Sequence, residues 1–142
     1  MEEPKTVRFD ELDLDAVDGG EPATRWLAGF PFSPDRPGGT TAAATEFTVV
    51  YNETEPGNRI GTHSDAAAEL LFVLTGRVEA TVGEETTTVS AGSLTVLPAE
   101  TEHRVRNNGT QTGELVGVFG TAPVESTFET EPVVGTADHD DD

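Results

Sequence analysis

The sequence predicts an all-β protein whose antiparallel strands close into a barrel or jelly roll. Three observations lead to this fold class. From residue 45 onward, short runs rich in β-branched and aromatic residues alternate in hydrophobicity with a period of two, turn residues separate them at roughly regular intervals, and no convincing helix lies between them. Seven or eight such strands indicate a closed or double-sheet architecture, because closure removes exposed strand edges.

The first 44 residues are predicted to form an acidic, proline-rich N-terminal arm. Trp26, Leu27, Phe30 and Phe32 make an apolar patch that several prolines interrupt. Such a pattern favours an extended segment, laid either over the core or over a partner subunit, and disfavours a helix. The last residues, 123–142, are predicted to be an acidic C-terminal tail.

Residues 45–122 are predicted to form the barrel itself. In the first run Phe47, Val49 and Tyr51 alternate with polar or smaller residues, and residues 77–82 alternate in the same way. Further strands are expected near residues 86–89, 94–97, 103–106 and 114–119. The stretch 64–71 contains helix formers, but the pattern breaks within one or two turns, so we interpret it as a loop followed by a strand that begins near Glu69.

The net charge of the chain disfavours two classes of binding partner, nucleic acids and anionic membranes. Twenty-seven acidic residues against eight basic ones give a net charge of −19, which argues against binding to nucleic acid or to an anionic membrane. The acid is spread along the chain, which favours adaptation to molar salt over a docking surface for a cation, and the composition is similar to that of proteins from halophilic archaea. With no cysteine and no apolar segment long enough to span a membrane, we expect a cytoplasmic protein.

Two of the three histidines occur in clusters with glycine, proline and carboxylate residues. On a strand that begins near Glu69, residues 69, 71 and 73 share one face, with His63 just upstream. If this hairpin faces the one that carries His103, the three polar side chains converge. Imidazole and carboxylate together are the ligands that borderline divalent metals prefer, so a metal site is predicted.

The spacing of these clusters resembles the two motifs of the cupin superfamily. The first motif is similar at every position except Asp65, where the family has a second histidine, and the second has Glu100 where a glycine is usual. The matching residues are Gly57, His63, Glu69 and Gly76, then Gly92, Pro98, His103 and Asn107. The resemblance implies a small single-domain cupin with a double-stranded β-helix fold, and it covers about residues 45–120.

The resemblance also implies one divalent metal ion per chain, iron, manganese, nickel or zinc, held by His63, Glu69 and His103. Asp65 has three open interpretations: a further ligand, a residue that orients water, or a cap of the local turn. A second carboxylate ligand would shift the preference toward manganese or iron. Glu69 has an alternative too, as the ion-pair partner of Arg59 or Arg104.

These features predict a metal-dependent, oxygenase-like enzyme that acts on a small organic molecule. A non-catalytic cupin that binds a ligand or a metal is the alternative, and an oxoglutarate-type triad of His63, Asp65 and His103 is less favoured because it leaves Glu69 without a role. A homodimer is expected, because cupins commonly pair through an exchanged strand or arm. The predicted pocket residues are Phe47, Val49, Arg59, Leu71, Val105 and Phe119.

Overall fold

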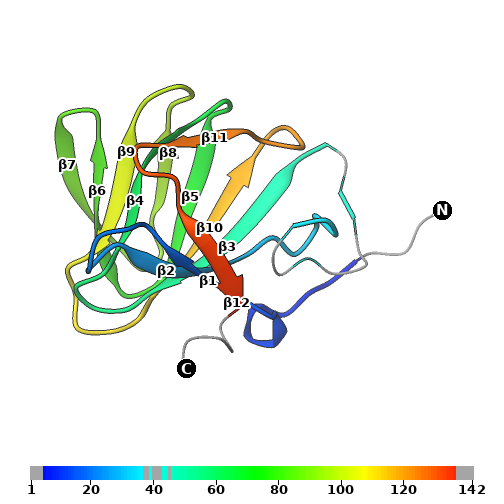
Figure 1. Cartoon of the computed structure of the whole chain (residues 1–142), viewed down its shortest axis with the longest axis horizontal. Coiled ribbons are helices and arrows are strands. Elements are labelled where there is room, and N and C mark those ends of the chain that lie inside the picture. The colour runs from blue at the N-terminus through cyan, green and yellow to red at the C-terminus, as the bar shows by residue number, and fades with distance from the viewer. Residues whose placement is uncertain (1–4, 37–38, 40–42, 45, 137–142) are drawn as a thin grey trace.

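The computed structural model describes residues 5–36, 39, 43–44 and 46–136, and it consists of two antiparallel sheets that face each other (Figure 1). One sheet has the order β12 (Val133–Thr136), β1 (Asp15–Asp18), β2 (Arg25–Gly29), β3 (Thr48–Thr54), β10 (Gly113–Phe119), β5 (Glu69–Thr75) and β8 (Leu94–Leu97). The other has the order β11 (Ser126–Phe128), β4 (Arg59–Asp65), β9 (His103–Asn107), β6 (Arg77–Val82) and β7 (Glu85–Ser90). The predicted all-β jelly-roll class is confirmed.

The strands of the central segment lie close to where the sequence placed them. β8 and β10 begin and end within one residue of the expected ranges, and residues 66–67 form a bend before β5 begins at Glu69. Among the described residues the helical content is a single 3-10 turn, η1 (Phe9–Glu11). The alanine-rich stretch is therefore a loop, as the break in its pattern indicated.

The segments expected as an arm and a tail contribute four strands. β1 pairs with β2 and with β12, and β2 continues the sheet by pairing with β3, while β11 pairs with β4 of the other sheet. Trp26 and Ala28 of β2 are buried in the main core. The apolar patch of the N-terminal segment therefore packs on its own barrel.

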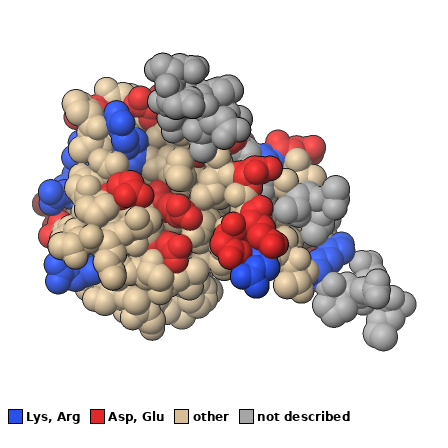
Figure 2. Space-filling model, turned by 90° about the horizontal axis from the view of Figure 1, so that it is seen from below, with Lys and Arg blue, Asp and Glu red and all other residues tan. Residues whose placement is uncertain are grey.

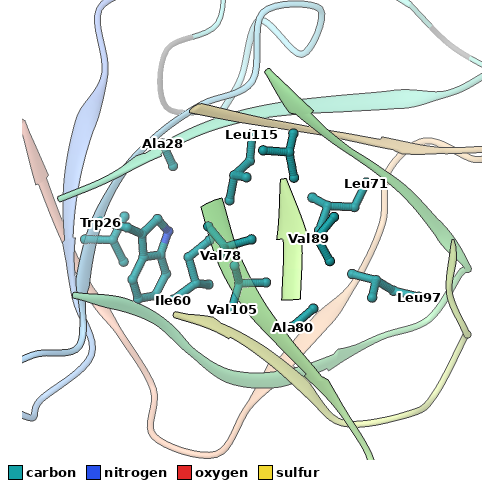
Figure 3. Packing of buried hydrophobic residues seen from close by; sticks show 12 residues of the cluster. Trp26, Ala28, Ile60, Leu71, Val78, Ala80, Val89, Leu97, Val105 and Leu115 are labelled. Carbon is teal, nitrogen blue, oxygen red and sulfur yellow. The ribbon is translucent and has the colours of Figure 1, made fainter. Parts of the chain in front are cut away.

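The main core fills the space between the sheets, and Figure 3 shows its side chains pointing toward one another from both layers. Period-two burial supplies it, as in β6, where Val78 and Ala80 are buried and their neighbours are more exposed. The buried members are Val17, Trp26, Ala28, Ile60, Leu71, Val73, Val78, Ala80, Val89, Leu97, Val105 and Leu115.

Strand β3 is buried on both faces, which the sequence pattern did not indicate. Val50 and Asn52 face the barrel interior, whereas Tyr51 is covered on the outer face by Phe9 of η1, with ring centroids 4.7 Å apart. The alternation in this strand was predicted with the correct period but the opposite phase. The reason is that residues outside the barrel segment bury the outward side chain.

Charged side chains are distributed over the surface, and Figure 2 shows acidic groups at several separate places on one face. Among the described residues, no helix is long and apolar enough to cross a membrane.

Candidate metal centre and its cavity

A β-bulge in β4 directs His63 into the barrel. Ile60 pairs with Val105 of β9, but His63 pairs with His103, so one extra residue of β4 is inserted between the two pairs. With regular alternation, the pattern that buries Ile60 would turn position 62 inward and position 63 outward. The bulge shifts this phase, which is the re-aiming of a side chain that bulges near sites provide.

His63, Asp65 and His103 meet inside the barrel. Nε2 of His63 lies 3.6 Å from Oδ2 of Asp65, and Nε2 of His103 lies 3.4 Å from the same oxygen. One ligand atom from each residue falls within 4.8 Å of the others. A metal ion about 2.0–2.2 Å from each ligand places neighbouring ligand atoms roughly 3.0–3.6 Å apart, so the two distances from the histidines to Asp65 are compatible with one ion.

Backbone carbonyls orient both imidazoles. Nδ1 of His63 bonds with the carbonyl oxygen of Gly61 at 2.8 Å, and Nδ1 of His103 bonds with that of Thr101 at 3.2 Å. A carbonyl only accepts, so each Nδ1 carries the hydrogen and each Nε2 presents a lone pair to the centre. Burial, followed by the nearby His63, lowers the pKa of His103, which favours the neutral form that binds a metal.

Asp65 is held by a residue far away in the sequence. The hydroxyl of Ser126 on β11 donates to Oδ1 of Asp65, whereas Oδ2 is buried without a hydrogen-bond partner, as is Nε2 of His103. Unpartnered buried polar atoms are costly, and a cation between these two would satisfy both. His63, Asp65 and His103 therefore form a candidate site for a divalent metal ion.

Glu69 lies beside this cluster but outside the group of three. Its Oε1 is 3.8 Å from Nε2 of His103, and burial, followed by the charge of Asp65, raises the pKa of Glu69 to about 8. Space for its carboxylate depends on Gly117 of β10, because a Cβ atom there would overlap Oε2 of Glu69. Arg59, considered from the sequence as a partner for Glu69, instead donates to Thr24 and pairs with an acidic residue on the surface.

A mostly apolar cavity of about 240 Å³ opens beside the cluster. Three of the predicted pocket residues, Leu71, Val105 and Phe119, line it. Its further lining consists of residues from β1, β2, β3, β4, β5, β8, β9, β11 and β12 and from two loops: Val17, Trp26, Ala28, Phe30, Arg36, Val50, Asn52, Ile60, His63, Glu69, Leu97, His103, Phe128, Pro132 and Val134.

Three predicted pocket residues do not line this cavity. Phe47 precedes β3 and is exposed, and Val49 points away from the interior because the phase of β3 is the opposite of the expected one. Arg59 is adjacent to inward-facing Ile60, so its side chain lies on the other face of β4, near Thr24. The structure therefore places these three side chains away from the cavity beside the metal cluster.

The structure adds site residues that the sequence did not indicate. The hydroxyl of Ser126 orients Asp65. The ring of Phe128 stacks on His63, with ring centroids 4.5 Å apart, and also on Trp26, with ring centroids 5.9 Å apart. These residues lie in the segments expected as a tail and an arm. The pairing of β11 with β4 brings Ser126 and Phe128 to the site, and no local pattern indicates that long-range pairing.

The fold and the site together describe a small β-barrel protein whose two antiparallel sheets enclose a candidate metal centre of histidine and carboxylate side chains. Residues 50–119 match the model of the cupin domain family. The match covers just under half of the chain, so it is this segment that resembles a cupin domain.

Several solved structures share the fold. The chain is 17% identical to oxalate decarboxylase from Lactobacillus farciminis, solved in complex with formate, with a TM-score of 0.66 over 84% of this chain and 34% of the enzyme. It is 17% identical to salicylate 1,2-dioxygenase from Pseudoaminobacter salicylatoxidans, solved with gentisate, with a TM-score of 0.62 over 80% of this chain and 31% of the enzyme.

A conserved protein of unknown function from Streptococcus pyogenes, SPY1581, is 20% identical, with a TM-score of 0.55 over 71% of this chain and 77% of that one. The chain thus spans about a third of the length of the two enzymes, and at these identities the likeness extends to the fold alone. No curated protein matches its sequence.

Proposed function

We propose that this protein is a metal-dependent cupin enzyme with oxygenase-like chemistry on a small organic molecule. The observation that carries the proposal is the pair of buried, unpartnered atoms, Oδ2 of Asp65 and Nε2 of His103, which face each other at 3.4 Å. The adjoining apolar cavity supplies a place for a substrate.

His63, Asp65 and His103 would hold the metal, and Glu69 is the proposed fourth ligand. A bound iron or manganese ion would supply redox chemistry with dioxygen, whereas nickel or zinc would polarise an oxygen atom of the substrate. Two carboxylates in the site favour manganese or iron. The apolar walls would hold the substrate and limit the access of water to it.

The test is the metal content of the purified protein. Wild type is expected to contain about one equivalent of metal, and His103→Ala and Asp65→Ala are expected to lose most of it, because each removes a ligand. His139→Ala is the matched control, since it removes the third histidine of the chain and is expected to retain the metal. Equal metal content in all four proteins, or none in wild type after reloading, would contradict the proposal.

Activity is tested separately, by oxygen uptake with protein loaded with iron or manganese and supplied with enediol or flavonoid substrates. The alternative function, a non-catalytic binding module, is favoured by one feature, the aspartate at position 65 where the family has a histidine. Stoichiometric metal without uptake of oxygen and without an exchangeable water on the metal would support that alternative.

We also propose that two copies of the chain pair through the outer face of β5 and β8. Large apolar side chains are exposed there, and Leu70 pairs across the strands with Val96. Their exposed fractions lie between 41% and 60%, and they are Leu70, Leu74, Leu94 and Val96. An exposed apolar patch is typical of an interaction surface. A second copy of the chain would place the same uncharged patch against this one, whereas the rest of the surface is acidic.

Sedimentation at several protein concentrations tests this pairing. Val96→Glu, on the edge strand of one sheet, is expected to convert the dimer to a monomer. Thr87→Glu, an exposed position on the edge strand of the other sheet, should leave the dimer intact. A monomeric wild type, or equal behaviour of the two variants, would overturn the proposal.

A further inference from the structure

The cavity beside the candidate metal centre contains one strong cation. Among the described residues that line it, Arg36 is the only arginine or lysine, and it comes from a segment outside residues 50–119, which match the cupin family. Most of the other lining side chains are apolar, and the polar ones outside the metal site are limited to Asn52. Arg36 therefore dominates the recognition of any charged ligand in this cavity.

The position of Arg36 is fixed by its own loop. Its backbone N–H donates to the carbonyl oxygen of Ser33 at 2.9 Å, and the N–H of Ser33 donates to that of Phe30 at 3.1 Å, so two turns fold the chain back on itself. The guanidinium carbon then lies 3.8 Å from the centre of the Phe30 ring, a cation–π contact. The side chain is thus held at the cavity before any ligand arrives.

No carboxylate of the described residues forms an ion pair with Arg36 within 4.0 Å. Its side chain is partly buried, and the burial lowers its pKa, while the charge of Asp65 raises it. Arginine stays protonated at neutral pH, so a partly desolvated positive charge lies within the field of the metal site without a protein anion beside it. An anionic group of a ligand would complete this arrangement.

The surroundings restrict which anion fits. A single guanidinium binds a carboxylate through two parallel hydrogen bonds. A phosphate dianion has more negative charge, so Asp65 and Glu69 would repel it more strongly, and no second arginine or lysine lines the described cavity to compensate that charge. At about 30 Å³ for each water-sized group, the 240 Å³ cavity takes a ligand of roughly eight non-hydrogen atoms. The rings of Trp26, Phe30 and Phe128 favour a flat apolar body.

We infer that the ligand is a small monocarboxylate with a flat apolar body, and that Arg36 binds its carboxylate while the aromatic rings enclose the rest. The inference rests on the proposed function for the choice of this cavity as the substrate site. It deepens that proposal, because it assigns the substrate class and names a specificity-determining residue outside the cupin motifs.

Binding of benzoate, followed by the fluorescence of Trp26, tests the inference. Trp26 is the only tryptophan in the chain and lines the cavity, so it reports occupancy directly. Benzamide is the uncharged comparison, and phenyl phosphate is the dianionic one. Wild type is expected to bind benzoate more tightly than either, and Arg36→Gln should weaken benzoate roughly 10- to 100-fold while changing benzamide little.

Arg25→Gln is the matched control, since Arg25 is exposed on β2 and does not line this cavity, and Arg36→Lys should restore only part of the affinity because lysine lacks the planar fork. Each titration is made on metal-free and on zinc-loaded protein. The loss of benzoate affinity in Arg36→Gln is expected in both forms. If the protein binds no metal, the proposed function is contradicted, but the metal-free titrations still test whether Arg36 binds the carboxylate. Equal binding of benzoate to wild type and Arg36→Gln, or no binding of benzoate to wild type, would overturn the inference.

Discussion

At the scale of single residues, the site depends on which atom of each side chain is already engaged. Both imidazoles use Nδ1 for a backbone carbonyl, and Asp65 uses Oδ1 for Ser126, so the remaining atoms face one another. Such outer contacts fix ligand orientation and basicity. At position 65, where the cupin motif has a histidine, the carboxylate of the aspartate is oriented by a hydroxyl from β11.

Ser126→Ala is expected to weaken metal binding. The substitution leaves Asp65 in place but frees its carboxylate to rotate, and the loss of such a supporting contact lowers metal affinity about 10- to 100-fold. Calorimetric titration with manganese or zinc measures the change. Thr127→Ala is the control, because that residue is exposed and next in the chain. Equal affinities for the two variants would show that the hydroxyl does not support the site.

Glu69 gives the metal-free protein a pH-dependent stability. Its pKa is raised to about 8 in the folded state, from 4.5 for an ordinary glutamate, so the folded protein retains a proton that the unfolded chain releases. The folded state then binds more protons between these values, and the free energy of unfolding falls as the pH rises from 4.5 toward 8. Glu69→Gln cannot ionise and lacks this contribution.

Urea unfolding of metal-free wild type and Glu69→Gln at several pH values measures this contribution of Glu69 to the free energy of unfolding. The difference in the free energy of unfolding between the variant and wild type should grow in favour of the variant from pH 5 to pH 8. Comparison with the variant is needed because the lowered pKa of His103 acts with the opposite sign. Glu102→Gln, at an exposed position, should run parallel to wild type. If the free energy of unfolding of Glu69→Gln also changed with pH in parallel with that of wild type, the raised pKa of Glu69 would be refuted.

At the scale of elements, Asn107 at the end of β9 joins the two sheets. Its Nδ2 donates to the carbonyl oxygens of Thr54 on β3 and Gln111, each at 2.8 Å, and its Oδ1 accepts from the N–H of Gly109 at 2.9 Å. The side chain is fully buried. This motif residue therefore acts in the architecture and not in the cavity, where it makes no part of the lining.

Asn107→Ala should lower the free energy of unfolding by about 3 kcal/mol and the melting temperature by about 10 °C, because it leaves buried backbone groups without partners. Asn108→Ala is a matched control, since Oδ1 of Asn108 has no hydrogen-bond partner, and its effect should stay within about 0.5 kcal/mol. Thermal unfolding followed by circular dichroism measures both. A similar loss in the two variants would contradict the role assigned to Asn107.

Local patterns predicted the central strands well, and the positions where they did not have physical causes. The phase of β3 was missed because Phe9, about forty residues away, covers Tyr51. His63 was expected upstream of a strand, whereas a bulge inside β4 brings it inward. Glu100, noted where the family has glycine, holds a left-handed φ of 58°, so the backbone kept the turn although the residue type changed.

The contributions of Ser126 and Arg36 had no signal in the sequence at all. Ser126 reaches the site through the long-range pairing of β11 with β4, and Arg36 reaches the cavity through local turns between Phe30 and Arg36. Neither residue lies in a motif or a periodic run. A strand as short as β11 has too few residues for a hydrophobic period to be visible. Motif spacing could therefore nominate His63, Asp65, Glu69 and His103 as candidate site residues, but it could not indicate that Ser126 contacts Asp65 or that Arg36 lines the cavity.

At the scale of the whole molecule, the net charge of −19 predicts a protein that requires salt for stability. Acidic side chains on one small barrel repel one another in dilute buffer, where the Debye length is about 10 Å, and much less at 1 M salt, where it is about 3 Å. Folding concentrates these charges, so the repulsion acts on the folded state more than on the expanded unfolded chain. The melting temperature is therefore expected to rise by about 10 °C or more between 0.1 M and 2 M potassium chloride.

Salt also strengthens the burial of apolar groups, so a variant is needed to separate the two effects. Glu84, Glu85 and Glu102 are exposed and form none of the observed ion pairs, and replacing all three by glutamine changes the net charge from −19 to −16. If repulsion dominates, the triple variant will be more stable than wild type at 0.1 M salt, and the two melting temperatures will converge at 2 M. Curves that rise in parallel would mean that salt acts on the apolar core and that the acidic surface has no part in the salt dependence.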